Sequence, residues 1–212
     1  MINHDTVSAS LTVELFDTVG AVSTVPFTTT DSTSPAFTGS VSSLTIPTNS
    51  SIVLTSGTPS SGATNWARIT TDRAVSILTV FEFRTSPGTL VLRVGVPAVS
   101  SNMKKFLMPR LRNVTDNVTT AFAMVNTSSA PETITGTLYS TTGTVLGTGT
   151  LVLAGGNHKA QFATEFFGLT GETGSAAFSH IVFEATSSSM AATALVFEGG
   201  QTASFPVSDI GS

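Results

Sequence analysis

The chain has 212 residues, of which 40% are apolar and only 10% are charged. A net charge of −4 argues against nucleic-acid binding, because that function requires a basic face. The absence of cysteine excludes disulfides, no apolar run reaches the roughly 18 residues of a membrane span, and no signal-peptide pattern opens the chain. A composition rich in Ser, Thr and Val but poor in Lys and Glu favours strands over helices.

The N-terminal stretch introduces a pattern that the chain uses twice. The aligned stretches are 1–22 with 124–145, 44–46 with 151–153, and 69–82 with 185–198. The change of offset places 16 extra residues between Gly20 and Leu44 of the first copy, and nine extra residues before Ala185 of the second. Insertions of this kind are tolerated in loops, so the sequence predicts two copies of one fold.

Alternating apolar residues predict short strands throughout the first copy. Leu11, Val13 and Leu15 share one face of the first of them. The predicted strands of this copy are 11–16, 41–46, 51–55, 66–70, 75–83 and 90–96. The strand 75–83 is apolar on both faces, which is typical of a central strand. Ser, Thr, Asp and Pro predict a loop at 28–35.

Each copy follows its first aligned strand with a tight turn. Asp17 and Gly20 bound this turn in the first copy, and Ser140 and Gly143 bound it in the second. An Asp or Ser in the first position and a Gly in the last are typical of a type I turn that closes a hairpin. We therefore expect both glycines to have positive φ.

The second copy has the same character and one addition. The expected domain organisation is a first sandwich at 1–98, a linker at 99–104 and a second sandwich at 105–212. Further strands are predicted at 106–111, 121–126, 144–153, 176–186, 190–197 and 203–207. The i, i+4, i+7 spacing of Phe162, Phe166 and Leu169 predicts one helical turn that the first copy lacks.

About seven or eight short strands per copy, with frequent turn signals, predict an all-β fold. We expect two tandem antiparallel β-sandwich (Ig-like) domains, the first incomplete at its N-terminus, because the strands that precede Met124 have no counterpart before Met1. The gap would be filled by a neighbouring chain through strand addition, or by the 16-residue insertion around Phe37 and Val41, or not at all.

The residue types that carry catalysis do not form a recognisable arrangement. His4, His158 and His180 lack the spacing of a metal motif, and Gly147-Thr148-Gly149 lacks the third glycine of a dinucleotide-binding loop. We therefore expect no enzyme and no catalytic, cofactor-binding or metal site.

Candidate contacts for a ligand or partner are Trp66, Lys104, Lys105, Arg110 and Arg112. The four basic residues suit an acidic polymer, but charges on an edge strand also serve to block aggregation. Trp66 suits a sugar-stacking platform, but its alignment with Val182 favours a core position. Glu82 and Glu198 align with each other and are expected to be solvated or paired with arginine.

Several core and turn positions of the second copy resemble the uncharacterised β-sandwich repeats of large secreted bacterial proteins. They are Phe106-Leu107-Met108-Pro109, Val125-Asn126, Leu138-Tyr139 with Gly143, Phe162 with Phe166-Phe167, Ala194-Leu195-Val196-Phe197 and Phe205-Pro206-Val207. The resemblance covers most of 105–208 and, more weakly, 1–97. It implies an extracellular or cell-surface, non-catalytic module without a cofactor. We expect a structural or adhesive module that acts as a self-assembling surface or filament subunit. The alternative is a carbohydrate-binding module of a secreted bacterial protein.

Overall fold

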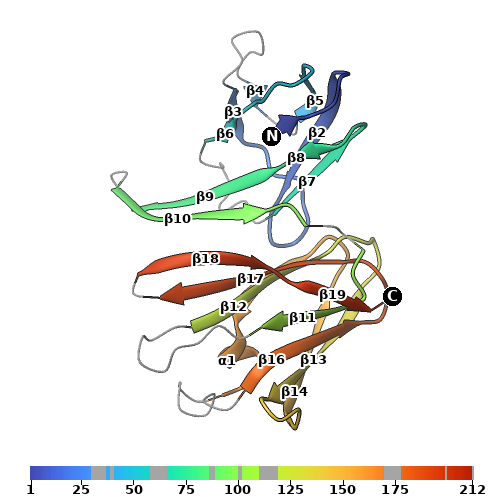
Figure 1. Ribbon diagram of the computed structural model, residues 1–212, viewed down its shortest axis with the longest axis vertical. Coiled ribbons are helices and arrows are strands. Elements are labelled where there is room, and N and C mark those ends of the chain that lie inside the picture. The colour runs from blue at the N-terminus through green and yellow to red at the C-terminus, as the bar shows by residue number, and fades with distance from the viewer. Residues whose placement is uncertain are drawn as a thin grey trace. The chain divides into compact units, whose positions relative to one another are not determined.

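A computed structural model of the chain is mostly β and antiparallel, which confirms the all-β prediction (Figure 1). It describes residues 1–29, 37–38, 41–57, 66–85, 89–99, 102–109, 119–169, 178–198 and 200–211. The chain divides into two compact units, Met1–Leu78 and Thr79–Ser212, which are described here one at a time.

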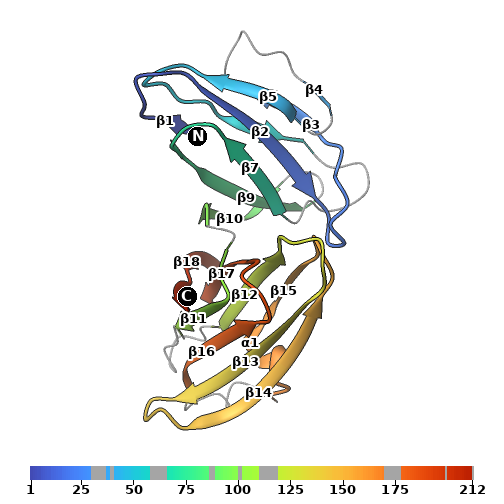
Figure 2. The same cartoon turned by 90° about the vertical axis from the view of Figure 1, so that its right-hand side faces the viewer.

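The second unit contains two larger sheets, one of five strands and one of four. The five-stranded sheet has the order β14-β13-β16-β11-β19, and the four-stranded sheet has the order β15-β12-β17-β18 (Figure 2). Their bounds are β11 Lys105–Pro109, β12 Thr119–Asn126, β13 Glu132–Ser140, β14 Val145–Leu153, β15 His158–Phe162, β16 Phe178–Ala185, β17 Met190–Glu198, β18 Gln201–Pro206 and β19 Ser208–Gly211. A two-stranded hairpin, β9 Leu78–Thr85 with β10 Thr89–Pro97, precedes them.

Alternate residues of both sheets meet in one core. In β13, Ile134, Gly136 and Leu138 face the core while Thr135 and Thr137 between them face outward, as the period of a strand requires. The core also contains Phe106, Met108, Phe122, Met124, Ile181, Phe183, Met190, Ala192 and Ala194. This shared core makes the arrangement sandwich-like.

The predicted helical turn is present as α1, Ala163–Phe166. Phe166 packs edge-on against Phe122 and Phe183 in the core. Its ring lies over a pair of facing glycines, Gly136 in β13 and Gly149 in β14, where a Cβ atom would stand 2.6 Å from the ring. With four residues, α1 is the single helix of the described residues, and no helix in them is long and apolar enough to cross a membrane.

The first unit is built from shorter strands. Their bounds are β1 Ile2–Asn3, β2 Ala9–Phe16, β3 Pro26–Thr29, β4 Phe37–Thr38, β5 Val41–Ile46, β6 Leu54–Ser56, β7 Trp66–Thr71 and β8 Val75–Ser76. They form the sheets β5-β2-β7, β4-β3-β6 and β1-β8. The buried core consists of Leu11, Val13, Leu15, Val25, Phe27, Leu44, Ile46 and Ile52.

In the second unit, a buried asparagine at the end of β12 holds the neighbouring loops and strand ends together. The side chain of Asn126 is fully buried, and its Nδ2 atom lies within hydrogen-bond distance of the carbonyl oxygens of Ala130 (2.7 Å), Leu153 (3.1 Å) and Ala154 (3.3 Å). Its Oδ1 atom accepts from the backbone N–H of Ser128 at 3.0 Å. One side chain thus ties the end of β12 to the loop that follows it and to the end of β14.

Asn3 does the same in the first unit. It too is fully buried, and its Nδ2 atom lies 2.8 Å from the carbonyl oxygen of Val7, 3.1 Å from that of Ile46 and 3.2 Å from that of Pro47. Its Oδ1 atom accepts from the backbone N–H of Asp5 at 2.9 Å. The repeat offsets match each partner of Asn3 to a partner of Asn126: Val7 to Ala130, Ile46 to Leu153, Pro47 to Ala154 and Asp5 to Ser128. This correspondence confirms the internal repeat at this point.

The strands that follow are equivalent as well. Leu15 of β2 faces Ala67 of β7, and Leu138 of β13 faces Ile181 of β16 in the same antiparallel arrangement. Both leucines are buried. The prediction that these two leucines occupy the same strand of their repeats is confirmed.

The alignment of the next strand is wrong by two residues. Phe16 of β2 lies opposite Trp66 of β7, and Tyr139 of β13 lies opposite His180 of β16. Trp66 therefore corresponds to His180, and its predicted equivalence with Val182 is wrong. A shift of two residues leaves each side chain on the same face of the sheet, so sequence alternation could not detect it.

The 16-residue insertion supplies the strand that the first copy lacks. Thr28 of β3 lies opposite Thr55 of β6, whereas in the second unit Ala121 of β12 lies opposite Phe162 of β15. Thr55 and Phe162 are equivalent positions of the repeat, so β3 takes the place of the first half of β12. The other neighbour of β3 is β4, which contains Phe37. The insertion thus fills the part of the gap that corresponds to β12, while in the described residues β7 has no neighbour corresponding to β11.

Because β3 replaces the first half of β12, the last strands of the first copy are also arranged differently. β4 pairs with β3 as the second half of β17 pairs with β12 in the other repeat. β8 pairs with β1, and the next strand, β9, pairs with β10 in a separate sheet. Phe81, in β9, is 41% exposed, and among the described strands β9 pairs with β10 alone, whereas Phe197 lies in β17 between β12 and β18. The predicted central strand at 75–83 and the predicted equivalence of Phe81 with Phe197 are therefore wrong.

Both turn glycines have the expected conformation, with φ of 78° at Gly20 and 82° at Gly143. A Cβ atom at Gly143 would meet nothing within 4 Å, so a substitution there is strained by the backbone conformation alone. We expect Gly143→Val to lower the free energy of unfolding by about 1–2 kcal/mol, and Gly143→Asn by less, because asparagine tolerates positive φ. Urea denaturation measures both, and equal costs for the two variants would contradict this account.

Candidate binding face

The outer face of the five-stranded sheet carries polar, charged and aromatic side chains of the kinds that contact ligands. Strand alternation turns the odd-numbered residues of β13 outward, and the register aligns them in rows across β16 and β11. The rows are Thr135, Glu184 and Lys105; Thr137, Val182 and Leu107; and Tyr139, His180 and Pro109. A shallow groove of about 480 Å³ runs along this face.

The first row is charged. The Lys105 ammonium lies 3.0 Å from a carboxylate oxygen of Glu184, and both side chains are largely exposed. Exposed ion pairs contribute at most about 1 kcal/mol to stability, so this pair is available for contact with a polar ligand. Lys104 lies beside it at the groove.

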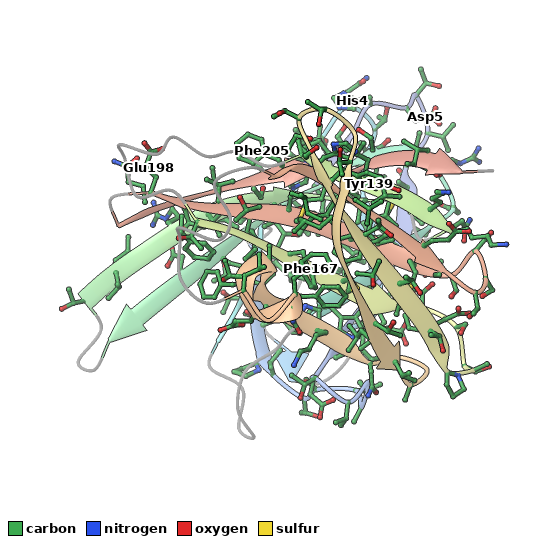
Figure 3. The ribbon with its side chains drawn as sticks, turned by 90° about the horizontal axis from the view of Figure 1, so that it is seen from below. His4, Asp5, Tyr139, Phe167, Glu198 and Phe205 are labelled. Atoms are coloured by element: carbon green, nitrogen blue, oxygen red, sulfur yellow. The ribbon has the colours of Figure 1, made fainter. Side chains whose placement is uncertain are left out.

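The third row is aromatic. The rings of Tyr139 and His180 stack, with centroids 5.0 Å apart and an angle of 9° between their planes. The Nδ1 atom of His180 is 2.7 Å from the hydroxyl oxygen of Ser179, which holds the imidazole in this orientation. Tyr139 is half-buried and lies on the strands, whereas Phe167 lies beside the helical turn (Figure 3).

The equivalent place in the first unit also carries a stacked aromatic pair. Phe16 and Trp66 stack with centroids 4.0 Å apart and 12° between planes. The guanidinium of Arg68 lies 5.2 Å from the centre of the Phe16 ring and 5.4 Å from that of Trp66, within the range of a cation–π contact. Trp66 is only 8% exposed, so its ring does not offer a sugar-stacking platform.

The structure separates the predicted contact residues. Lys104 and Lys105 border the groove of the second unit, while Trp66 lies in the first; Arg110 and Arg112 lie outside the described residues. The interpretation of the two lysines as edge-strand charges is wrong, because β11 is flanked by β16 and β19. The sequence did not predict β19, a four-residue strand near the C-terminus that pairs with β11.

Sequence reasoning also missed the pairing of Tyr139 with His180. The signal was present, because Phe16 aligns with Tyr139, and a two-residue correction brings Trp66 onto His180. An aromatic pair at the same place in both repeats would then have been visible without a structure.

The other predicted positions of interest lie elsewhere. The Nε2 atom of His4 is 3.1 Å from the hydroxyl oxygen of Ser76, and burial lowers the pKa of His158. The carboxylate of Glu82 accepts a hydrogen bond from the Nε atom of Arg93 at 2.8 Å. Of the two predicted alternatives, solvation or pairing with arginine, the structure shows the second. In the described part of the chain, no three His, Cys, Asp or Glu side chains form a group that could hold a metal ion.

Glu132 lies buried behind the groove, at the start of β13. Its carboxylate accepts hydrogen bonds from the hydroxyls of Thr186 and Ser187 and from the backbone N–H of Ser187 at 3.0 Å. Burial by itself raises the pKa of the Glu132 carboxyl, but the hydrogen bonds outweigh burial and leave that pKa below its ordinary value. The group thus fastens β13 to the turn between β16 and β17.

The lowered pKa predicts how the stability of the second unit depends on pH. The carboxylate stabilises the fold fully above the pKa that glutamate has in the unfolded chain, about 4.3, and this contribution is lost as the pH falls toward the lower pKa of the folded state. We expect Glu132→Gln to be less stable at neutral pH and to lose less stability than the unchanged chain between about pH 5 and pH 3. Urea denaturation at a series of pH values measures the slope. The exposed Glu198→Gln is the control, and an unchanged slope in Glu132→Gln would contradict the assignment.

Comparison with protein-family models, with curated proteins and with solved structures found no match for this chain.

Proposed function

We propose that this chain is a non-catalytic structural and adhesive module made of two Ig-like β-sandwich repeats, displayed outside the cell or on its surface. The observation that carries the proposal is the pair of asparagine networks. Two pairs of residues that the repeats share shape their loops and turns: the side chains of Asn3 and Asn126 tie loops to strands, and Gly20 and Gly143 allow the positive φ of the turns. An aromatic pair recurs on the outward face of both repeats, but the row beside it differs, with Glu14 and Arg68 in the first unit and Thr137 and Val182 in the second. A scaffold that is duplicated while its surface varies suits a module whose contacts are made by sheet faces and edges.

Adhesion is tested directly with coated beads. We expect beads that carry the whole chain at high density to cluster with one another, because a structural module of an assembly must bind its own kind or its neighbours. Beads coated with a heat-unfolded sample of the same chain are the control. Beads that neither cluster nor bind to polysaccharide-coated beads would contradict the proposal.

A carbohydrate-binding module is the second candidate, and the stacked Tyr139–His180 pair favours it. An aromatic ring beside hydroxyl and charged groups suits a sugar, whose apolar face stacks while its hydroxyls bond to polar neighbours. Thr137 and Lys105 border the same groove. Affinity electrophoresis in polysaccharide gels tests this candidate: retarded migration that is lost in Tyr139→Ala but kept in Phe16→Leu would support it. Equal migration with and without polysaccharide would exclude it for the polymers used.

A further inference from the structure

One edge of the five-stranded sheet differs from the other described edges of the two larger sheets. Its last strand, β14, pairs with β13 alone among the described strands and runs along the outside of the sheet (Figure 2). It spans nine residues with the sequence VLGTGTLVL, which contains no charge and no proline. Such a strand offers a long row of backbone N–H and C=O groups to another strand.

The other three edges of the two larger sheets are protected. β15 carries His158 and Lys159, and the four-residue β19 carries Asp209. β18 ends in Pro206 and lies beside β10, whose Gly95 carbonyl accepts from the hydroxyl of Ser204. Charge, proline, shortness and cover are the usual means by which sheet edges avoid pairing, and β14 shows none of them within the part of the chain that the structure describes.

The outer face of β14 is also apolar at both ends. Val152 is 62% exposed and Leu146 is 47% exposed, and both side chains point to the same side of the strand. Thr148 and Thr150 lie between them on that side. An exposed β14 therefore leaves both backbone hydrogen-bonding groups and apolar side chains in contact with water.

The sequence of β14 is complementary to itself. When two copies are placed antiparallel about Gly149, Leu146 of one faces Val152 of the other, and Thr148 faces Thr150. On the core side, Gly147 faces Leu151, so a small residue meets a large one. Each position thus meets a partner of suitable polarity, and cross-strand pairs of this kind stabilise antiparallel sheets. This self-complementarity identifies the occupant of the edge as a second copy of the same strand.

We propose that two copies of this chain associate through β14, antiparallel and centred on Gly149, to join their five-stranded sheets into one continuous sheet. The proposal rests on the proposed structural function and names the contact by which the module assembles. The arrangement has two-fold symmetry and closes on itself, so it produces a dimer.

Two double variants test the contact and its direction. Leu146→Lys/Val152→Lys places lysine opposite lysine in the antiparallel arrangement, whereas Leu146→Lys/Val152→Glu places lysine opposite glutamate. Both change the same two exposed positions. Analytical ultracentrifugation of the whole chain over a concentration series should show a dimer for the unchanged chain and for the Lys/Glu variant. The Lys/Lys variant should dissociate with a constant at least tenfold higher than that of the Lys/Glu variant.

A matched control comes from the other repeat. Thr45 of β5 is exposed and occupies the position equivalent to Val152, so Thr45→Lys repeats the Val152→Lys half of the Lys/Lys variant in the first unit. It should leave the dimer unchanged. Far-ultraviolet circular dichroism establishes that each variant is folded.

Several results would overturn the proposal. They are a monomeric unchanged chain at all accessible concentrations, equal dissociation constants for the two double variants, and dissociation caused by Thr45→Lys. The bead-clustering experiment distinguishes a wrong β14 contact from a wrong proposed function. If one of these results is obtained while beads coated with the unchanged chain still cluster, the module is adhesive through another surface and only the β14 contact is wrong.

Discussion

Asn126→Ala should lower the free energy of unfolding of the second unit by about 3–5 kcal/mol. The substitution leaves the buried carbonyl group of Leu153 without this donor and the N–H of Ser128 without its acceptor, and it removes one of the two donors to the carbonyl group of Ala130. Each unsatisfied buried group costs about 1–3 kcal/mol. Thr135→Ala, at an exposed position of β13, is the control and should cost less than about 0.5 kcal/mol.

The chain contains its own probes for this measurement. Its single Tyr, Tyr139, lies in the second unit, and its single Trp, Trp66, lies in the first. Urea unfolding followed through tyrosine signals should shift in Asn126→Ala, and the tryptophan transition should shift in Asn3→Ala. A loss below about 1 kcal/mol in Asn126→Ala would show that the network around it is not needed for stability.

Gly136→Val should destabilise the second unit by about 3 kcal/mol, although valine is the better strand former. Its Cβ atom would stand 2.6 Å from the Phe166 ring and 2.9 Å from the ring of Phe183, which is fully buried. Overpacking of a filled core costs about 1–3 kcal/mol or more. Gly147→Val is the matched control on the neighbouring strand, since nothing lies within 4 Å of the Cβ position, and it should be nearly neutral.

The repeat explains why glycine stands at this position. Val13, buried in the first unit, occupies the position equivalent to Gly136, and the described part of that unit contains no helical turn like α1. Phe166 therefore fills the space that the valine side chain fills in the other copy. If so, Gly136→Val combined with Phe166→Ala should be more stable than the sum of the two single losses predicts. Simple additivity in this double-mutant cycle would contradict the exchange.

Alternation and turn chemistry were sufficient to predict most strands and both turn glycines. The insertion was harder, because 28–35 has the composition of a loop, whereas Pro26–Thr29 forms β3 through pairing with β6. Pairing between distant segments is not encoded in local propensity, so tertiary contacts decide such short strands. The same reason explains why the four-residue β19 and the departure of β9 from the sheet were not predicted.

The candidate face was only partly visible in the sequence. Lys105 was identified by charge, but its partner Glu184 is 79 positions away and is brought to it by the pairing of β11 with β16. Trp66 attracted attention as the only tryptophan, yet its position over Phe16 buries it. Which aromatic residue is accessible depends on packing, and composition does not record it.

The position of β19 has a consequence for the order in which the second unit is made. β11 is the first strand of the five-stranded sheet in the chain and β19 is the last, yet they are neighbours, with Lys105 paired to Gly211. A ribosome must therefore release almost the whole unit before this sheet gains its final strand. Contacts between residues so far apart are formed slowly, because a long loop must close before they form. Folding of the second unit should be slow, and a nascent chain that stops before Ser208 should present the β11 edge, with Lys105, to solvent.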